Sequence, residues 1–208
     1  MGKCLFMRKG IVHTIPGSRL PSGYTELAYI QSSGTQYINT VFKPNQDTRI
    51  VCDFELLSSN VLTSVFGARI SYKNTAFVLW GGGDSSKTHF QDDYSNESDT
   101  TISSNAGKYS IDKNKNSTAI NSSTHTFNSA NFQSAYQLYI CAINTAGTAV
   151  FGTGGLRIYS FQIYDDGTLV RDFFPCIKDD GEVGLYDLVG KQFYGNAGTG
   201  VFTGSEVA

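Results

Sequence analysis

Short runs of apolar and β-branched residues, separated by clusters of Gly, Asn, Asp and Ser, recur along the chain from Tyr24 onward. Each run is rich in Val, Ile, Tyr, Phe or Thr and is too short for a stable amphipathic helix. The pattern therefore predicts an all-β fold. The clearest expected strands are 35–39, 48–57, 64–70, 75–80, 108–112, 136–143, 156–164, 168–174 and 192–194.

Two of these runs, 75–80 and 136–143, are apolar at nearly every residue. Such runs are typical of strands that are covered on both faces, in the middle of a sandwich or in the wall of a groove. Asp165-Asp166-Gly167 separates two further runs, and Asp-Gly favours the positive φ of a tight hairpin turn. Together these signals predict a single two-sheet antiparallel sandwich.

The stretch 84–131 has a different composition, dominated by Ser, Asn, Asp and Lys with scattered apolar residues. It predicts long loops and edge strands on one side of the sandwich. Such segments vary readily and often carry recognition, so this side is the expected place for a binding site.

Charge is distributed unevenly along the 208 residues, whose net charge is −2. Residues 1–25 contain Lys3, Arg8, Lys9 and Arg19 and no acid, whereas the remainder has 12 basic and 18 acidic residues. A body with a charge of −6 argues against a nucleic-acid-binding surface, which needs clustered Lys and Arg. We therefore expect an extended basic arm at 1–23, followed by one sandwich domain at 24–208.

The start of the chain is not typical of a secretory signal, because its apolar stretch ends at Arg8-Lys9 and no cleavage site follows. No apolar run is long enough to span a membrane.

The four cysteines, Cys4, Cys52, Cys141 and Cys176, are widely separated and form no CxxC pair, so zinc is not expected. Cys52 and Cys141 lie in strand-like runs and are expected to be reduced core residues.

Several segments are similar to a known kind of module. The segment LPSGYTELAYIQSSGTQYINT at 20–40 resembles the opening of a concanavalin-A-like, laminin-G-like jelly-roll module that is frequent in phages and prophages of Gram-positive bacteria. The segments SVFGAR at 64–69, RIYS at 157–160, VGLYD at 183–187 and FYGN at 193–196 resemble later strands of that module. The resemblance implies a concanavalin-A-like sandwich over roughly 20–205 and leaves the ligand open.

The arm, MGKCLFMRKG and on to His13-Thr14, is similar to a leader on phage virion proteins that carry unrelated C-terminal modules. This resemblance implies an attachment peptide that docks on other virion proteins through Leu5, Phe6, Met7, Arg8 and Lys9. It also implies a protein of the phage particle, made in the bacterial cytoplasm. From the residues themselves, neither a signal peptide nor a membrane partner is expected. By analogy with fibres and spikes, we expect a homo-oligomer.

Concanavalin-like sandwiches include glycoside hydrolases, which need two carboxylates at a defined separation. Asp53 and Glu55 would share one strand face, but no third carboxylate continues the pattern, and a solvent-facing strand edge is the simpler interpretation. The histidines His13, His89 and His125 lie in the arm and the polar loops, and no nucleophile elbow is present.

We expect a non-enzymatic tail, head-fibre or decoration component that displays a lectin-like sandwich for host or mucosal glycans. The alternatives are a carbohydrate-active enzyme and a bacterial surface adhesin.

Two sets of residues are candidate binding sites. Trp80 precedes Gly81-Gly82-Gly83-Asp84 and could stack on a sugar ring while Asp84 bonds its hydroxyls, although the composition of the apolar run favours a Trp80 that continues into the core. Tyr94 is the third candidate for this glycan site. No cofactor is expected, apart from calcium as an alternative to an ordinary polar loop, because the oxygen-rich run 92–99 is spaced somewhat like a calcium loop. Its candidate ligands are Asp92, Asn96 and Asp99.

Overall fold

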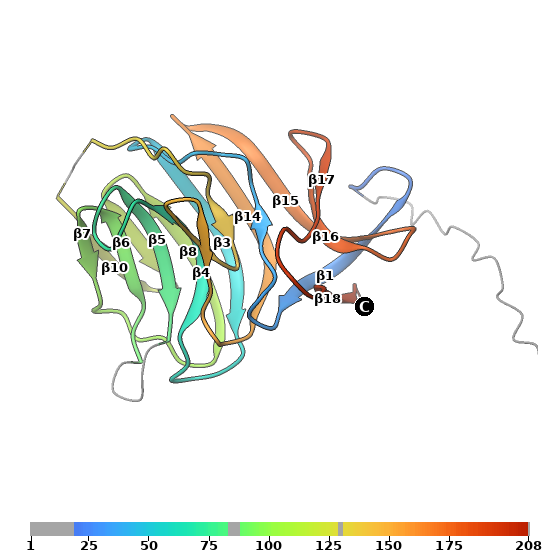
Figure 1. Ribbon diagram of the computed structural model, residues 1–208, viewed down its shortest axis with the longest axis horizontal. Coiled ribbons are helices and arrows are strands. Elements are labelled where there is room, and N and C mark those ends of the chain that lie inside the picture. Colours follow the sequence, from blue (N-terminus) through green and yellow to red (C-terminus); the bar gives the residue numbers. More distant parts are fainter. Residues whose placement is uncertain (1–18, 83–87, 129–130, 208) are drawn as a thin grey trace, which may run out of the picture.

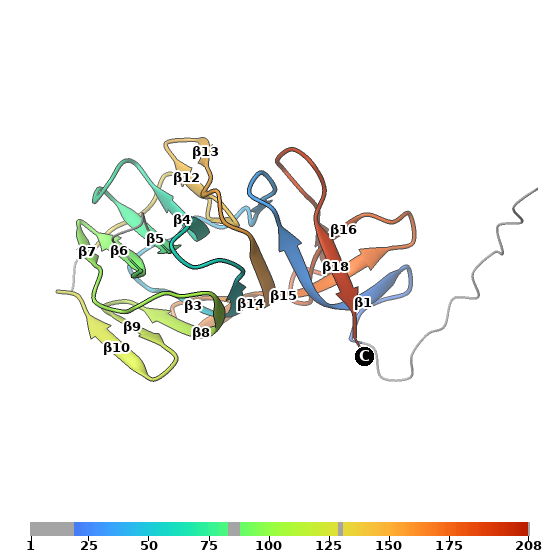
Figure 2. The same ribbon diagram turned by 90° about the horizontal axis from the view of Figure 1, so that it is seen from below.

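The computed structural model describes residues 19–82, 88–128 and 131–207. This part of the chain folds into eighteen strands and no helix, in two sheets that pack as a sandwich (Figure 1). The predicted all-β, jelly-roll-like class is therefore confirmed. Figure 2 shows the small sheet above the β3, β8 and β9 part of the large sheet, while β1, β15, β16 and β18 extend the large sheet beyond it.

The large sheet has ten strands in the described residues, and its hydrogen-bonded neighbours are antiparallel. β18 pairs with β1 outside the main path, and β14 pairs with β15 as well as with β1. In spatial order the strands are β10 (Ser123–Thr126), β9 (Ser117–Ile120), β8 (Gly107–Asn114), β3 (Thr48–Leu56), β14 (Leu156–Asp165), β1 (Tyr24–Ser32), β15 (Thr168–Lys178), β16 (Val183–Asp187) and β17 (Gln192–Tyr194), with β18 (Thr203–Glu206) beside β1.

The small sheet covers one face of the large one with eight strands of the described chain. β11 pairs with both β2 and β4, and β12 runs parallel to β4, whereas the other pairs are antiparallel. In spatial order the strands are β13 (Thr148–Val150), β12 (Ile143–Thr145), β4 (Thr63–Arg69), β5 (Ala76–Gly81), β6 (Gln91–Ser95) and β7 (Glu97–Asp99), with β11 (Tyr139–Ile140) and β2 (Ile38–Asn39) alongside.

The core lies between the sheets and follows the alternation of side chains along each strand. In β3, Ile50, Cys52 and Phe54 point inward and are fully buried, whereas Asp53 is exposed on the opposite face. β5 is buried at every residue because both of its faces are covered. The doubly apolar run at 75–80 therefore behaves as the sequence predicted.

The hairpin expected around Asp-Gly is present between β14 and β15. Asp165 pairs with Thr168, and the two residues between them, Asp166 and Gly167, have φ of 46° and 73°. Positive φ at both central residues is the requirement of a type I′ turn, whose twist matches that of antiparallel strands. This turn fixes the register of the two longest strands in the sheet.

Two expectations about the strands need correction. The run 136–143 is not one strand, because Cys141, with a φ of 66°, separates β11 from β12. The stretch 84–131 supplies the expected edge strands, β10 to the large sheet and β7 to the small one, but it also forms β6, β8 and β9 inside the sheets, where long loops were expected. Two charged side chains of this stretch, Asp92 and Lys113, point inward and pair with each other.

Cys52 and Cys141 are free and buried, as expected, and Cys176 is also free and buried, whereas Cys4 lies outside the described residues. No helix in the described part of the chain is long and apolar enough to cross a membrane. Within the predicted arm, Leu20 is already buried against the sandwich, and the Arg19 guanidinium lies 3.7 Å from the centre of the Phe174 ring.

Candidate binding face

The outer face of the large sheet carries a row of polar side chains across four neighbouring strands. Lys108 of β8 lies opposite Glu55 of β3, Glu55 opposite Arg157 of β14, and Arg157 opposite Gln31 of β1. Directly opposite residues on one face contact each other, and opposite charges stabilise such a pair. The strict alternation of β3 places Glu55 here because Phe54 and Leu56 face the core.

A β-bulge places one additional side chain on this face. Ile158 pairs with Phe54 and Ser160 pairs with Asp53, so Tyr159 is an extra residue in β14. As a result, both Tyr159 and Ser160 lie on the outer side and are partly exposed. Bulges of this kind re-aim side chains and are frequent beside functional sites.

Hydrogen bonds hold Glu55 as an acceptor at the centre of the row. The Tyr159 hydroxyl donates to Glu55 Oε2 over 2.5 Å, and Arg157 Nη1 donates to the same oxygen over 3.1 Å. The Tyr159 hydrogen bond lowers the pKa of Glu55, burial opposes this, and Arg157 adds to the lowering. Burial and the bond to Glu55 raise the pKa of Tyr159, which keeps its hydroxyl a donor. Arg157 Nε also donates to Gln31 Oε1 over 2.8 Å.

Two aromatic rings of this face, those of Tyr159 and Tyr29, each have a cationic side chain close to the ring centre. The Tyr159 and Tyr29 rings meet edge to face with centroids 5.7 Å apart. The Lys108 ammonium lies 4.7 Å from the centre of the Tyr159 ring, and the Arg157 guanidinium lies 4.4 Å from that of Tyr29. These contacts hold the ring of Tyr159 in place beside the row.

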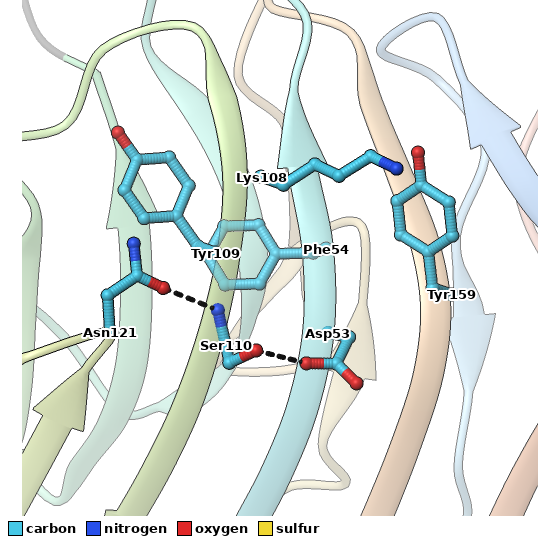
Figure 3. Close-up of a pocket in the computed structure, with 7 residues that line it drawn as sticks. All are labelled: Asp53, Phe54, Lys108, Tyr109, Ser110, Asn121 and Tyr159. Carbon is cyan, nitrogen blue, oxygen red and sulfur yellow. Dashed lines mark hydrogen bonds between the residues drawn. The ribbon is translucent and has the colours of Figure 1, made fainter.

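A shallow depression of about 290 Å³ lies next to Tyr159 (Figure 3). The Ser110 hydroxyl donates to Asp53 Oδ1 over 2.5 Å, and the Ser160 hydroxyl donates to Asp53 Oδ2 over 3.1 Å. The Ser110 amide donates to Asn121 Oδ1 over 2.9 Å, so the amide nitrogen of Asn121 is turned away from that contact. The lining residues are Asp53, Phe54, Lys108, Tyr109, Ser110, Asn121 and Tyr159.

This arrangement can bind a polyhydroxylated ligand more readily than it can catalyse hydrolysis. Carboxylate, amide, ammonium and hydroxyl groups surround the depression, and a tyrosine ring stands beside it. A glycosidase also needs a carboxylic acid whose pKa is raised. Glu55 has a lowered pKa and is engaged by two donors, so it is poorly suited to that role.

The residues predicted from sequence for glycan binding lie elsewhere. Trp80 is 5% exposed and packs with Val78 and Ile143 on the outer side of the small sheet. Tyr94 is fully buried between Phe127 and Phe132. Neither ring has a surface to offer a sugar, so stacking does not fit these positions, and the core alternative for Trp80 is the one observed. Asp84 lies outside the described residues.

The predicted calcium ligands are brought near one another without forming a cluster of free oxygens. Asp92 pairs with Asp99 across β6 and β7, but its carboxylate accepts hydrogen bonds from Lys113 and contacts His125. Asn96 is exposed in the turn between β6 and β7. Across 19–82, 88–128 and 131–207, no group of three or more His, Cys, Asp or Glu side chains is placed to hold a metal ion. The predicted docking residues Leu5, Phe6, Met7, Arg8 and Lys9 lie outside the described residues.

Sequence reasoning placed Asp53 and Glu55 on one solvent-facing strand surface, and the structure agrees. It missed Tyr159, Lys108, Ser110 and Asn121, because these residues meet only through the pairing of distant strands. One signal was available: in Ile158-Tyr159-Ser160-Phe161, two polar residues stand between two core residues, which breaks the alternation and marks a bulge.

No protein-family model matches this chain, and no curated protein matches it significantly.

Proposed function

We propose that this chain is a non-enzymatic component of a bacteriophage particle whose sandwich binds surface glycans on the outer face of β8, β3 and β14. The observation that carries the binding part is the depression beside Tyr159, where a partly exposed aromatic ring lies next to neutral and charged hydrogen-bonding groups. The resemblance of the sandwich and of the arm to virion modules supports the assignment to a phage.

The chemistry of the face favours hydroxyl-rich ligands. Sugars bind proteins through hydrogen bonds to fixed polar groups and through contact of C–H surfaces with aromatic rings. Here Asp53 and Asn121 are already oriented by Ser110, so little side-chain ordering remains to be done on binding. The face is also open, which suits a chain end or a branch of a surface polysaccharide.

A single shallow site of this kind is weak and therefore favours a multivalent display. One such site supplies roughly −4 kcal/mol, which corresponds to a millimolar dissociation constant. Display of many copies raises the effective strength by about 10²–10⁴. A phage particle provides those copies, which is why weak glycan binding and attachment to a particle belong together in this proposal.

The glycan-binding part is tested by probing a glycan array with protein that has been made multivalent on a scaffold. We expect the wild type to bind a subset of glycans and Tyr159→Ala to weaken that binding by about tenfold, the equivalent of an aromatic contact. Tyr72→Ala is the matched control, because Tyr72 is an exposed tyrosine at the turn between β4 and β5, away from the face. Absence of binding to any glycan would favour a purely structural or decorating role instead.

The attachment part is tested by removing residues 1–18, which keeps Arg19 and Leu20 in contact with the sandwich. Arg19 forms an ion pair with Glu26 over 2.6 Å, and Leu20 packs on Tyr186 and Cys176. We expect the shortened protein to fold, to keep its glycan binding and to be absent from purified particles. Incorporation at the wild-type level would contradict the docking role of the arm.

A further inference from the structure

A lysine and an aspartate are sealed between the two sheets at the end of the sandwich formed by β6 to β10. Lys113 of β8 belongs to the large sheet and Asp92 of β6 to the small sheet. Their side chains are 0% and 1% exposed, and Lys113 Nζ lies 2.5 Å from Asp92 Oδ1. Burial of a charged pair costs free energy through desolvation, which the attraction between the two charges only partly repays.

Three aromatic rings hold the lysine amine in place. Lys113 Nζ lies 4.9 Å from the ring centre of Phe77, 5.2 Å from that of Phe127 and 5.6 Å from that of Tyr94. All three rings are buried. The amine therefore cannot swing away from the carboxyl group, and the rings keep bulk water from both.

The other oxygen of the carboxyl group faces a histidine. His125 Nε2 lies 2.9 Å from Asp92 Oδ2, and His125 Nδ1 lies 3.6 Å from Asp99 Oδ1. The histidine ring thus lies between two carboxyl groups and is in hydrogen-bond contact with Asp92. The Lys113 amine and the His125 imidazole therefore contact the two oxygens of one buried carboxyl group.

We propose that Lys113 and Asp92 condense into an intramolecular isopeptide bond that joins the two sheets. Lys113 Nζ attacks Asp92 Cγ, a C–N bond forms, and the bond from Cγ to Oδ1 breaks. The two protons that leave the nitrogen end on the departing oxygen, which leaves as one water molecule. No oxidant, reductant or other reactant is consumed. These protons pass directly from Nζ to Oδ1, which lie 2.5 Å apart, and His125 polarises the carboxyl group through Oδ2.

The product fits the site better than the ion pair. Condensation removes both buried charges and leaves a neutral amide, whose desolvation costs less. Its carbonyl oxygen is the former Oδ2, which lies 2.9 Å from His125 Nε2 and can accept a hydrogen bond from that nitrogen. Because water is excluded, hydrolysis back to the acid is disfavoured. The bond would lock the end of the sandwich where β7 and β10 form the sheet edges.

The test is the intact mass of the full-length wild-type protein after prolonged incubation at neutral to alkaline pH. We expect a mass lower than that of the sequence by one water molecule. Trypsin should then release a branched peptide in which 88–108 is joined to 109–115, because cleavage after the modified Lys113 is blocked. Fragmentation should place the link on Asp92 and not on Asp93. A mass equal to that of the sequence at every pH would overturn the proposal.

Variants separate the reaction from other losses of water. Lys113→Met keeps the length of the side chain and removes the nucleophile, so its mass should equal that of its sequence. Lys115→Met is the matched control, because Lys115 is paired with Asp47 at 3.4 Å but half exposed, and it should keep the water deficit. His125→Gln should slow formation of the bond. A water deficit that persists in Lys113→Met would also overturn the proposal, whereas failure of that variant to fold leaves the wild-type measurement decisive.

Discussion

Replacement of Tyr159 by Phe removes one hydroxyl group from the binding face and leaves the aromatic ring in place. That hydroxyl donates to Glu55 Oε2 over 2.5 Å and is the main cause of the lowered pKa of Glu55. Arg157 continues to donate to the same oxygen in the variant. The variant therefore isolates a single hydrogen bond to a carboxylate whose other partner is unchanged.

The size of the effect follows from the strength of that bond. A hydrogen bond to a charged group contributes about 1.5–3 kcal/mol. Glu55 is 21% exposed, so the lower end of that range applies. We therefore expect Tyr159→Phe to remove about 1.5 kcal/mol of stabilisation from the ionised carboxylate, so that the pKa of Glu55 rises toward its ordinary value.

The assay is an NMR titration of the Glu55 carboxyl carbon in the wild type and in two variants. Tyr164→Phe is the matched control, because the Tyr164 hydroxyl donates to Gln162 on the same strand and not to Glu55. It should leave the Glu55 titration unchanged. An unchanged pKa in Tyr159→Phe, or an equal rise in both variants, would refute the arrangement of side chains around Glu55.

The lowered pKa of Glu55 also makes the stability of the folded protein depend on pH. The pKa of Glu55 is lower in the folded protein than in the unfolded chain, whose value is about 4.3. Ionised Glu55 therefore stabilises the fold above that pH, and this contribution is lost as the pH falls through the folded pKa. Tyr159→Phe should lose less stability than the wild type on acidification through this range, as measured by chemical denaturation.

Three further predictions concern the fold and the metal. Gly167→Ala should destabilise the protein by about 1–2 kcal/mol in chemical denaturation, because Gly167 has a φ of 73°. A Cβ at this position would meet no atom, so the cost comes from the backbone conformation alone, and an unchanged midpoint would contradict the type I′ turn. Phe161→Ala should cost about 3–5 kcal/mol, because its buried ring packs edge to face on Phe66 at 5.4 Å, and a cost below 1 kcal/mol would be too small for this packing. Millimolar calcium should leave the melting temperature unchanged, because Asp92 is engaged by Lys113 and His125, and a rise that a chelator reverses would contradict this.

The fold could be predicted from sequence wherever one strand face is apolar and the other polar. β3 and the hairpin of β14 and β15 have that pattern, and their boundaries agree with the expected ones to within a few residues. The prediction failed where a charged residue faces the interior. Lys113 and Asp92, in the polar stretch 84–131, were not expected in the core, because pairing across two sheets is invisible in a linear sequence.

The candidate site was harder to predict for a related reason. Trp80 was a candidate for sugar binding because it precedes a glycine-rich segment. In the fold, Ile143 and Val150 from a distant part of the chain help to cover it. Tyr159 was overlooked because its exposure depends on a bulge against β3. Single-strand patterns show which side chains leave the core, but only the pairing of strands shows which of them meet.

The claim that the outer face of β8, β3 and β14 is the binding site is tested most directly by amide NMR spectra recorded with a panel of neutral mono- and disaccharides at millimolar concentration. We predict that at least one saccharide shifts the resonances of Lys108, Ser110, Asn121 and Tyr159 in a saturable manner, with those of Tyr72 unchanged. Saturable shifts confined to another part of the molecule, or no shift with any saccharide of the panel, would contradict the account.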